Sequence, residues 1–198
     1  MGLNIQYHYH KYLNPIFWLP ASEVIYRLLI TFLRKDQDII EIGASSGHIS
    51  YFLGLAGYSI TLNEIRKDCI DQIKNTYNKH HVHAEYIHGD LFKIKNHYDF
   101  AWNTGLIQCF PYKKQIQFLK HLFFMSEKTL LIYPDTMSKN KKRGTNIKKI
   151  PGVDDAKEYS IEKIPSAAAQ IFSKTELGEL PAEQIQLSYR MYWLYLER

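Results

Sequence analysis

The sequence predicts an α/β protein with a doubly wound, mostly parallel sheet. Apolar runs of strand length alternate along the chain with stretches that repeat apolar residues at helical spacing. Glycine and proline punctuate these segments, as at Gly57 and Pro134. Strands that alternate with helices at this spacing form parallel sheets with helices on both faces, so a two-sided sheet is expected.

The predicted strands and helices alternate along the chain, as in a doubly wound sheet. Ser22 can cap the first helix, and Gly57 ends the second. The predicted helices are residues 23–34, 47–56, 66–77 and 113–124. The predicted strands are residues 38–42, 59–62, 84–88, 98–102, 129–133 and 184–197. Apolar and polar residues largely alternate in the last strand, which predicts that one of its faces is better covered than the other.

Length and composition fit one globular domain spanning residues 1–198. A chain of 198 residues suffices for one ordinary domain and is short for two. Hydrophobic residues make up 45% and charged residues 23%, a normal balance for a globular protein. The net charge of +5 permits contact with nucleic acid but does not require it.

The two cysteines and the absence of long apolar runs indicate the compartment. Cys69 and Cys109 have no partner motif and are typical of reduced thiols in an intracellular protein. No apolar run approaches the roughly 20 residues that span a bilayer. The N-terminus, rich in His and Tyr, does not resemble a signal peptide. We therefore expect a cytoplasmic protein, monomeric or homodimeric, without membrane contact.

A candidate nucleotide-cofactor site lies where the first two strands end. Residues 38–47, Asp-Ile-Ile-Glu-Ile-Gly-Ala-Ser-Ser-Gly, form a strand and a turn, and Glu64 ends the second strand. Backbone N–H groups of such a turn can approach a ligand, and the later carboxylate can accept from both ribose hydroxyls. The spacing Glu41-x-Gly43-x-x-x-Gly47 differs from the G-x-G-x-x-G of dinucleotide sites, so NAD is not expected.

This turn resembles motif I of the class I S-adenosylmethionine (SAM)-dependent methyltransferases, usually E-x-G-x-G-x-G. Ser45, a small residue, stands where the middle glycine of that motif occurs. The resemblance covers roughly residues 20–135 and, more loosely, the final strand. It implies a Rossmann-like sheet of about seven strands with an antiparallel last strand. It also implies SAM as the cofactor.

The resemblance places cofactor contacts after four strands in turn. It implies that Glu41 helps to hold the glycine loop and the amino end of the cofactor, and that Glu64 holds the ribose. Asp90 would accept from the adenine amine, and Asn103 begins a segment similar to motif IV, beside the transferring methyl group. The implied cofactor-binding residues are Glu41, Gly43, Ala44, Ser45, Gly47, Glu64, Ile65, Gly89, Asp90, Leu91, Asn103 and Gly105.

Substrate contacts are predicted from two further segments. The aromatic residues 1–20 either pack against the sheet edge or fold over the cofactor as a lid, as in many small-molecule methyltransferases. As a lid they would bring Tyr9 and Tyr12 to the substrate and offer His10 as a general base, with Asn103 as the second catalytic candidate. Gln108 lies where relatives often carry a Glu-His pair, and we expect it to contact the substrate.

Two other clusters have simpler explanations. Residues 136–150 are basic, and form either a solvated mobile loop or a phosphate-attracting patch beside the substrate mouth. His80, His81 and His83 have no nearby Cys or acidic residue at ligand spacing, so no metal site is expected.

We expect a methyltransferase that acts on a small molecule. No nucleic-acid or peptide module accompanies the domain, and Asn103 is followed by Thr104-Gly105 rather than by the Pro-Pro-aromatic pattern of amino-methylating enzymes. An RNA methyltransferase is the alternative, supported by the basic segment. A non-catalytic, methyltransferase-like binding protein is a further alternative, supported by Ser45.

Overall fold

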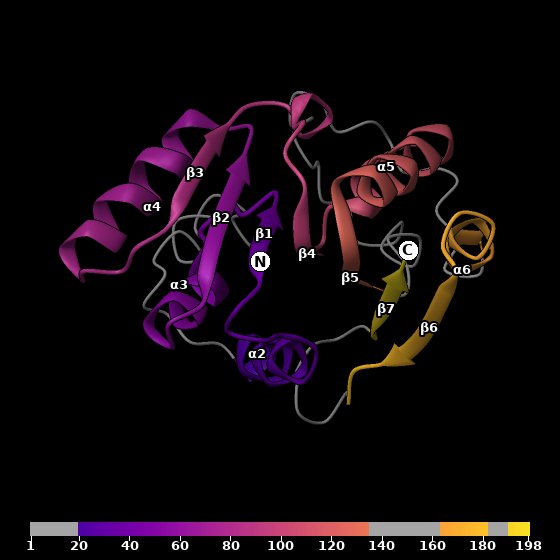
Figure 1. Cartoon of the computed structure of the whole chain (residues 1–198), viewed down its shortest axis with the longest axis horizontal. Helices are drawn as coiled ribbons and strands as arrows, with labels where there is room; N and C mark the ends of the chain where they lie inside the picture. Colours follow the sequence, from indigo (N-terminus) through magenta and orange to yellow (C-terminus); the bar gives the residue numbers. More distant parts are fainter. Residues whose placement is uncertain (1–19, 135–162, 182–189) are drawn as a thin grey trace, which may run out of the picture.

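The structure, a computed structural model, describes residues 20–134, 163–181 and 190–198 (Figure 1). The helices are α2 (Pro20–Phe32), α3 (His48–Leu55), α4 (Lys67–Lys79), α5 (Tyr112–Met125) and α6 (Lys163–Ala168), with the short 3-10 helices η1 (Leu91–Lys93) and η2 (Ile107–Cys109). The strands are β1 (Asp38–Ile42), β2 (Ser59–Glu64), β3 (Glu85–His88), β4 (Tyr98–Thr104), β5 (Ser126–Pro134), β6 (Lys174–Glu179) and β7 (Met191–Glu197).

The strands form one seven-stranded sheet in the order β3-β2-β1-β4-β5-β7-β6. Strands β1 to β5 pair in parallel, whereas β7 pairs antiparallel with both β5 and β6. The predicted doubly wound sheet with an antiparallel last strand is therefore confirmed. The chain runs outward in opposite directions from β1 and β4, and this is the point at which ligands bind in sheets of this kind.

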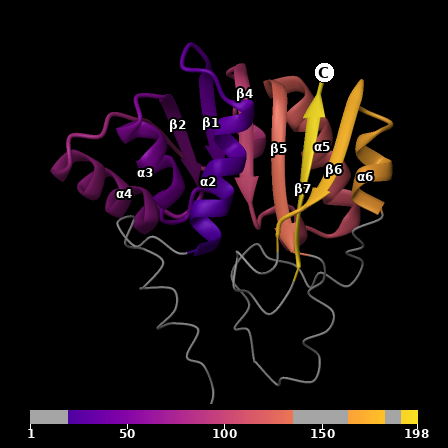
Figure 2. The same cartoon turned by 90° about the horizontal axis from the view of Figure 1, so that it is seen from below.

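Helices cover the two faces of the sheet and enclose two apolar cores. Side chains of α2, α3 and α4 pack on one face, around fully buried Leu29 and Trp102. Side chains of η1, α5 and α6 pack on the other face, around fully buried Phe118 and Leu194. Figure 1 shows α2 and α5 on opposite sides of the sheet, and Figure 2 shows the strands side by side with α2 in front.

The first helix begins earlier than its predicted cap. It starts at Pro20, and Ser22 lies inside its first turn. Proline is well suited to the first helical position, because its φ is fixed at a helical value and it needs no acceptor. The expected capping role of Ser22 is thus wrong, and its hydroxyl instead contacts His48.

The C-terminal part contains two elements that the sequence pattern did not predict, α6 and β6. Strand β6 is mostly polar and includes Gly178, so it lacks the apolar alternation typical of a strand. A Cβ at Gly178 would collide with the Trp193 indole on β7, which shows how closely the ring covers the glycine. The expected strand over 184–197 is observed from Met191, and its first residues lie largely outside the described ranges.

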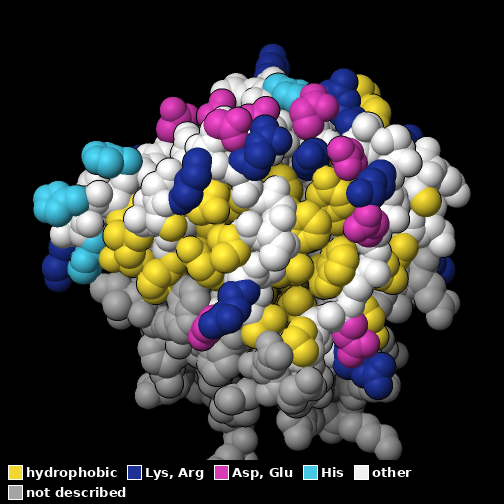
Figure 3. Space-filling view, turned by 60° about the horizontal axis from the view of Figure 1, so that its bottom comes forward, with side chains coloured by type: hydrophobic (Ala, Val, Ile, Leu, Met, Phe, Trp, Pro, Cys, Tyr) yellow, Lys and Arg dark blue, Asp and Glu magenta, His cyan; other side chains and the backbone are white. Residues whose placement is uncertain are grey.

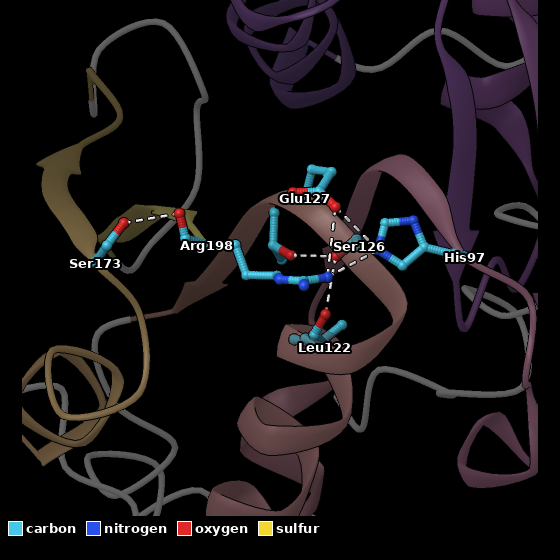
Figure 4. Close-up of polar contacts among 7 residues, drawn as sticks. His97, Leu122, Ser126, Glu127, Ser173 and Arg198 are labelled. Atoms are coloured by element: carbon cyan, nitrogen blue, oxygen red, sulfur yellow. Dashed lines mark hydrogen bonds and ion pairs between the residues drawn. The ribbon is translucent and has the colours of Figure 1, made fainter.

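Polar contacts fasten the end of β7 to the start of β5, at the amino-terminal edge of the parallel strands. Figure 4 shows Arg198 beside His97 and Glu127. Arg198 Nη1 lies 3.1 Å from His97 Nε2 and 3.4 Å from Glu127 Oε1. The hydroxyl of Ser173 donates to the Arg198 carbonyl at 2.8 Å, which ties β6 to the same corner.

Among the residues that the structure describes, no helix is long and apolar enough to cross a membrane. Cys69 is buried, Cys109 is partly buried, and neither forms a disulfide. The described ranges also hold no group of three His, Cys, Asp or Glu side chains that could bind a metal ion.

Candidate cofactor site

The carboxyl ends of β1, β2, β3 and β4 meet at one edge of the sheet. Backbone hydrogen bonds join the loops that leave these strands: Ala44 N–H donates to Asn63 O at 2.9 Å, and Gly89 N–H donates to Glu64 O at 3.0 Å. The Asn63 side chain donates to Gly89 O at 3.1 Å. The structure therefore brings the predicted residues after β1, β2 and β3 together.

The turn after β1, residues 43–47, is shaped by three residues with left-handed φ. Gly43, Ser45 and Gly47 have φ of 68°, 51° and 62°. A Cβ at Gly47 would lie 3.1 Å from the Tyr77 hydroxyl, so glycine is needed there for space as well as for φ. Ser45 occupies a conformation that costs an L-residue roughly 1–2 kcal/mol. We call residues 43–47 the glycine loop.

Glu64, the last residue of β2, holds the glycine loop in place. Its Oε2 accepts from Ser45 N–H at 2.8 Å, and its Oε1 accepts from Arg66 N–H at 3.0 Å. The side chain is buried. Each carboxylate oxygen has a second lone pair, so the group can accept further hydrogen bonds from a ligand.

Glu41, on β1, is a buried carboxyl with unused hydrogen-bonding capacity. Its Oε2 is buried and has no hydrogen-bond partner among the residues that the structure describes. Burial raises the pKa of Glu41 to about 8, and the nearby Glu64 carboxylate adds to this rise, whereas the Ser50 hydroxyl opposes it. The Ser50 hydroxyl makes no hydrogen bond of normal geometry, so neither group satisfies the other. A buried carboxyl of this kind suits a ligand group that donates hydrogen bonds.

Asp90 and Ile65 present a polar and an apolar side chain at the same edge. Asp90 is exposed, and its Oδ1 accepts from Phe92 N–H at 3.1 Å, which begins η1. Ile65 directly follows Glu64 and is 66% exposed, which is unusual for a large apolar side chain. The loops after β2 and β3, joined by the hydrogen bond from Gly89 N–H to Glu64 O, thus carry an exposed apolar side chain and an exposed carboxylate, which suit a flat heterocycle with an amino group.

Asn103 is buried and bonded within the protein. Its Nδ2 donates to Ile42 O at 2.8 Å, and its Oδ1 accepts from Leu106 N–H at 3.1 Å. Asn103 thus joins the end of β1 to the loop after β4. In this arrangement it positions that loop, and a direct catalytic role for Asn103 stays a prediction.

Gly105 and Gln108 lie in the loop after β4. Gly105 has φ of 73°, and a Cβ on it would lie 3.1 Å from Gln108 Nε2, so the glutamine side chain folds back over the glycine. Within the described ranges, Gln108 Oε1 is buried without a hydrogen-bond partner. The substrate contact of Gln108 stays a prediction, and its unpaired oxygen is an acceptor that a ligand could use.

His48 is a polar residue of the site that sequence reasoning missed. Its Nε2 lies 2.6 Å from Ser22 Oγ, and its Nδ1 lies 3.0 Å from Ser46 Oγ. Burial lowers the pKa of His48 to about 4, so the ring is neutral at pH 7. No motif marks this residue, because Ser22 and His48 are 26 positions apart and meet only when α2 packs beside the glycine loop.

Solved protein structures with the same arrangement identify the fold. The PH0226 protein from Pyrococcus horikoshii OT3 gives a TM-score of 0.69 at 17% identity, over 89% of each chain. Magnesium protoporphyrin IX methyltransferase from Synechocystis PCC 6803, with bound SAH, gives a TM-score of 0.70 at 14% identity, over 89% of this chain and 81% of that one. The chain has the class I methyltransferase fold.

A putative RNA methyltransferase from Pyrococcus horikoshii is also similar to this chain. Its TM-score is 0.57 at 14% identity, over 89% of this chain and 82% of that one. No protein-family model and no curated protein sequence matches the chain. The methyltransferase fold thus rests on the agreement of structures at low sequence identity, together with the sheet order.

Every residue predicted to bind the cofactor lies within the described ranges, in or just after β1 to β4, and the contacts themselves stay a prediction. The predicted substrate residues Tyr9, His10 and Tyr12 lie outside the described ranges, as does the basic segment 136–150. Gln108 is the predicted substrate residue that the structure does describe.

Proposed function

We propose that the protein is a SAM-dependent methyltransferase that binds its cofactor across the carboxyl ends of β1 to β4. The observation that carries the proposal is the meeting of the glycine loop with Glu41, Glu64 and Asp90 at the switch point of a methyltransferase fold. The structural neighbour from Synechocystis has been solved with bound SAH and with bound SAM.

The residues present fit this cofactor. Glu41 Oε2 is a buried acceptor without a partner, and it would accept from the amino group of the methionine part. Glu64 keeps two free lone pairs for the ribose hydroxyls, and the exposed Ile65 would cover one face of the adenine. Asp90 Oδ2 would accept from the adenine amine. When bound, SAM supplies a methyl group on an electrophilic sulfonium.

The protein's own contribution is mainly orientation. Because the donor is already activated, proximity and alignment of the acceptor supply most of the rate enhancement. Asn103 would fix the loop after β4, and Gln108 on that loop would hold the acceptor. We retain His10 as the proposed general base for an acceptor with a dissociable proton.

We propose a small molecule as the acceptor. The loop after β4 runs Asn103-Thr104-Gly105, without the Pro-Pro-aromatic pattern that holds an amino group of adenine or glutamine. RNA is the second candidate, favoured by the basic residues of the chain. Size fractionation and nuclease treatment of the product labelled from methyl-tritiated SAM separate these two acceptors.

Calorimetric titration with SAM, SAH and NAD tests the cofactor assignment. SAM and SAH should bind, and each should raise the melting temperature. At about 100 times the dissociation constant the added stability is roughly 2.7 kcal/mol. Binding of NAD without binding of SAM or SAH would contradict the proposal.

Removal of residues 1–12 tests the proposed substrate side. The truncated protein should keep its fold and most of its SAM affinity but lose turnover, because Tyr9, His10 and Tyr12 are removed. Circular dichroism, SAM titration and methyl transfer report the three properties separately. Unfolding of the truncated chain would instead show that residues 1–12 are needed for the fold, and the proposal of His10 as general base would lose its support.

A further inference from the structure

The outer surface of α5 carries a row of exposed side chains that the proposed methyl transfer does not use. Lys113, Gln117, Lys120 and Phe124 are exposed and lie at i, i+4, i+7 and i+11, which places them on one side of the helix. The opposite side, with Phe118 and its neighbours, is buried in the core. We call these four residues the α5 stripe. It extends over about 16 Å at 1.5 Å per residue.

The stretches of chain that form α5 and η1 are basic and contain no acidic residue. No Asp or Glu occurs from Phe100 to Ser126 or from Leu91 to Tyr98. Within the described ranges, the lysines of these two stretches form no ion pair, namely Lys93, Lys95, Lys113, Lys114 and Lys120. These lysines along α5 and η1 are therefore available to an anionic partner, although Asp90 caps η1 and Glu127 follows α5.

Other parts of the surface are different. On α4, Lys67 pairs with Asp71, and Arg66 before the helix pairs with Asp68. Figure 3 shows the face that carries α2, where basic and acidic side chains are interspersed. Within the described ranges, helix α4 also has lysines without an ion pair, Lys74 and Lys79. It carries Asp68 and Asp71 as well, whereas α5 carries no acidic residue.

Aromatic rings lie among these cations. Phe124 is 74% exposed, and its ring stands edge-on to Phe123 at 5.8 Å between centroids. Near the other end of the helix, Lys114 Nζ lies 5.6 Å from the Phe92 ring and 5.2 Å from the Phe110 ring. Phe110 is buried and Phe92 partly buried, so Phe124 is the ring that can accept a stacked base. An exposed ring beside cations that can follow a backbone is the combination found in single-strand binding surfaces.

We propose that the α5 stripe binds a single-stranded nucleic acid. Lys113 and Lys120 contact successive phosphates, and a base stacks on Phe124. An anionic membrane fits less well, because a helix at a membrane interface turns a broad apolar face outward, whereas α5 buries its apolar face in the core. A symmetric dimer through this stripe would bring like charges together.

Fluorescence anisotropy with a labelled single-stranded RNA tests the proposal on the full chain. The variant Lys113→Glu/Lys120→Glu should weaken binding strongly and reduce the slope of log K against log salt by about 1.4, for two lost phosphate contacts. Phe124→Ala should weaken binding by roughly tenfold and leave that slope unchanged, because stacking releases no counterions.

The matched control is Lys74→Glu/Lys79→Glu, which makes the same change of charge at exposed, unpaired lysines on α4. It should bind RNA much more tightly than the α5 variant. Equal loss in both variants would overturn the proposal, since the attraction would then depend on net charge alone. No effect of Phe124→Ala would also overturn it, as would α5-dependent binding to anionic vesicles or α5-dependent dimerisation in place of RNA binding.

The proposal does not depend on the proposed methyl transfer. Binding is measured without cofactor, and all substituted residues lie outside the candidate cofactor site. Loss of SAM binding in the wild type would refute the proposed function and leave the RNA result unaffected. A wild type that binds SAM but not RNA would refute only the role of the α5 stripe.

Discussion

Ser22 Oγ on α2 lies 2.6 Å from His48 Nε2, and this contact joins the first described helix to the start of α3. The other ring nitrogen of His48 faces Ser46 in the glycine loop. The imidazole thus links α2 to the glycine loop, which would hold the methionine part of the cofactor. Because burial holds the pKa of His48 at about 4, the link is made by a neutral ring at physiological pH.

We predict that His48 makes stability fall at acidic pH. The pKa of His48 is about 4 in the folded state and near its usual 6.5 in the unfolded chain, so acid favours unfolding. The stabilisation is complete above pH 6.5 and is lost as the pH falls toward 4. Its full size is on the order of 3 kcal/mol. Urea unfolding of wild type and His48→Gln across this range measures it, and parallel pH profiles of the two proteins would contradict it.

Glu41 should have the opposite pH signature. Its pKa is about 8 in the folded state and near 4.5 unfolded, so its burial destabilises the fold increasingly from pH 4.5 up to 8. Glu41→Gln should therefore be more stable than wild type at pH 8, by on the order of 1–3 kcal/mol, and similar to it at pH 4. Thermal unfolding without ligand at the two pH values provides the measurement. A less stable variant at pH 8 would show that Glu41 is ionised and well compensated.

The same group should make SAM affinity depend on pH. Binding of a cationic amino group favours the ionised carboxylate, so below pH 8 SAM binding must release the proton of Glu41. The affinity of wild type should rise from pH 6 to pH 8, by at most about tenfold per unit. Calorimetry in buffers of different ionisation enthalpy counts the released protons. The Glu41→Gln variant should bind more weakly and lose this component of the pH dependence.

Ser45→Gly should stabilise the protein. Ser45 has φ of 51°, and glycine adopts this conformation without the cost that an L-residue bears. Part of the gain is offset by the larger entropy of glycine in the unfolded chain, which leaves about 1 kcal/mol. Ser45→Ala keeps the Cβ and should give no gain. If Ser45→Gly and Ser45→Ala unfold at the same denaturant concentration, the left-handed φ of Ser45 does not lower the stability of the wild type.

Glu64→Ala should weaken SAM binding more than Asp90→Asn. The Glu64 change removes the proposed ribose acceptors and also the acceptor of Ser45 N–H, each bond being worth on the order of 1.5–3 kcal/mol. Asp90→Asn keeps an acceptor oxygen. Glu85→Ala, at the exposed far end of β3, serves as the control. Equal SAM affinity in wild type and Glu64→Ala would remove Glu64 from the site.

The sequence predicted the parallel half of the sheet because its signals are local. Strand β1 is a short, mostly apolar run, and β2 alternates Ile60 and Leu62 with polar residues. Gly57, with φ of 82°, ends the intervening helix region as expected. That the polar residues at the ends of these strands lie close together follows from one rule, namely that the carboxyl ends of parallel strands lie at the same edge of the sheet. The predicted residues after β1, β2 and β3 are therefore found together.

The features that the sequence did not predict depend on contacts between residues that are far apart in the chain. Strand β6 has no apolar alternation, and it is held by its pairing with β7, where Gly178 lies close against the Trp193 indole. The predicted cap at Ser22 is wrong because a serine before a helical pattern resembles a cap, whereas its actual partner, His48, lies in another element. The raised pKa of Glu41 likewise results from burial of its carboxyl group, and a sequence motif does not show whether a side chain is buried.

The connection from β3 to β4 has a consequence for chemical labelling. It contains only the three-residue η1, and a Cβ built on Gly89 would meet no atom within 4 Å. Among the described residues, the space directly beside Gly89, next to the proposed adenine position, is therefore open. Cofactor analogues enlarged at the adenine amine should fit this protein while being excluded from methyltransferases that close this side. Such an analogue, carrying a transferable tag, would mark the natural acceptor of this protein in a cell extract.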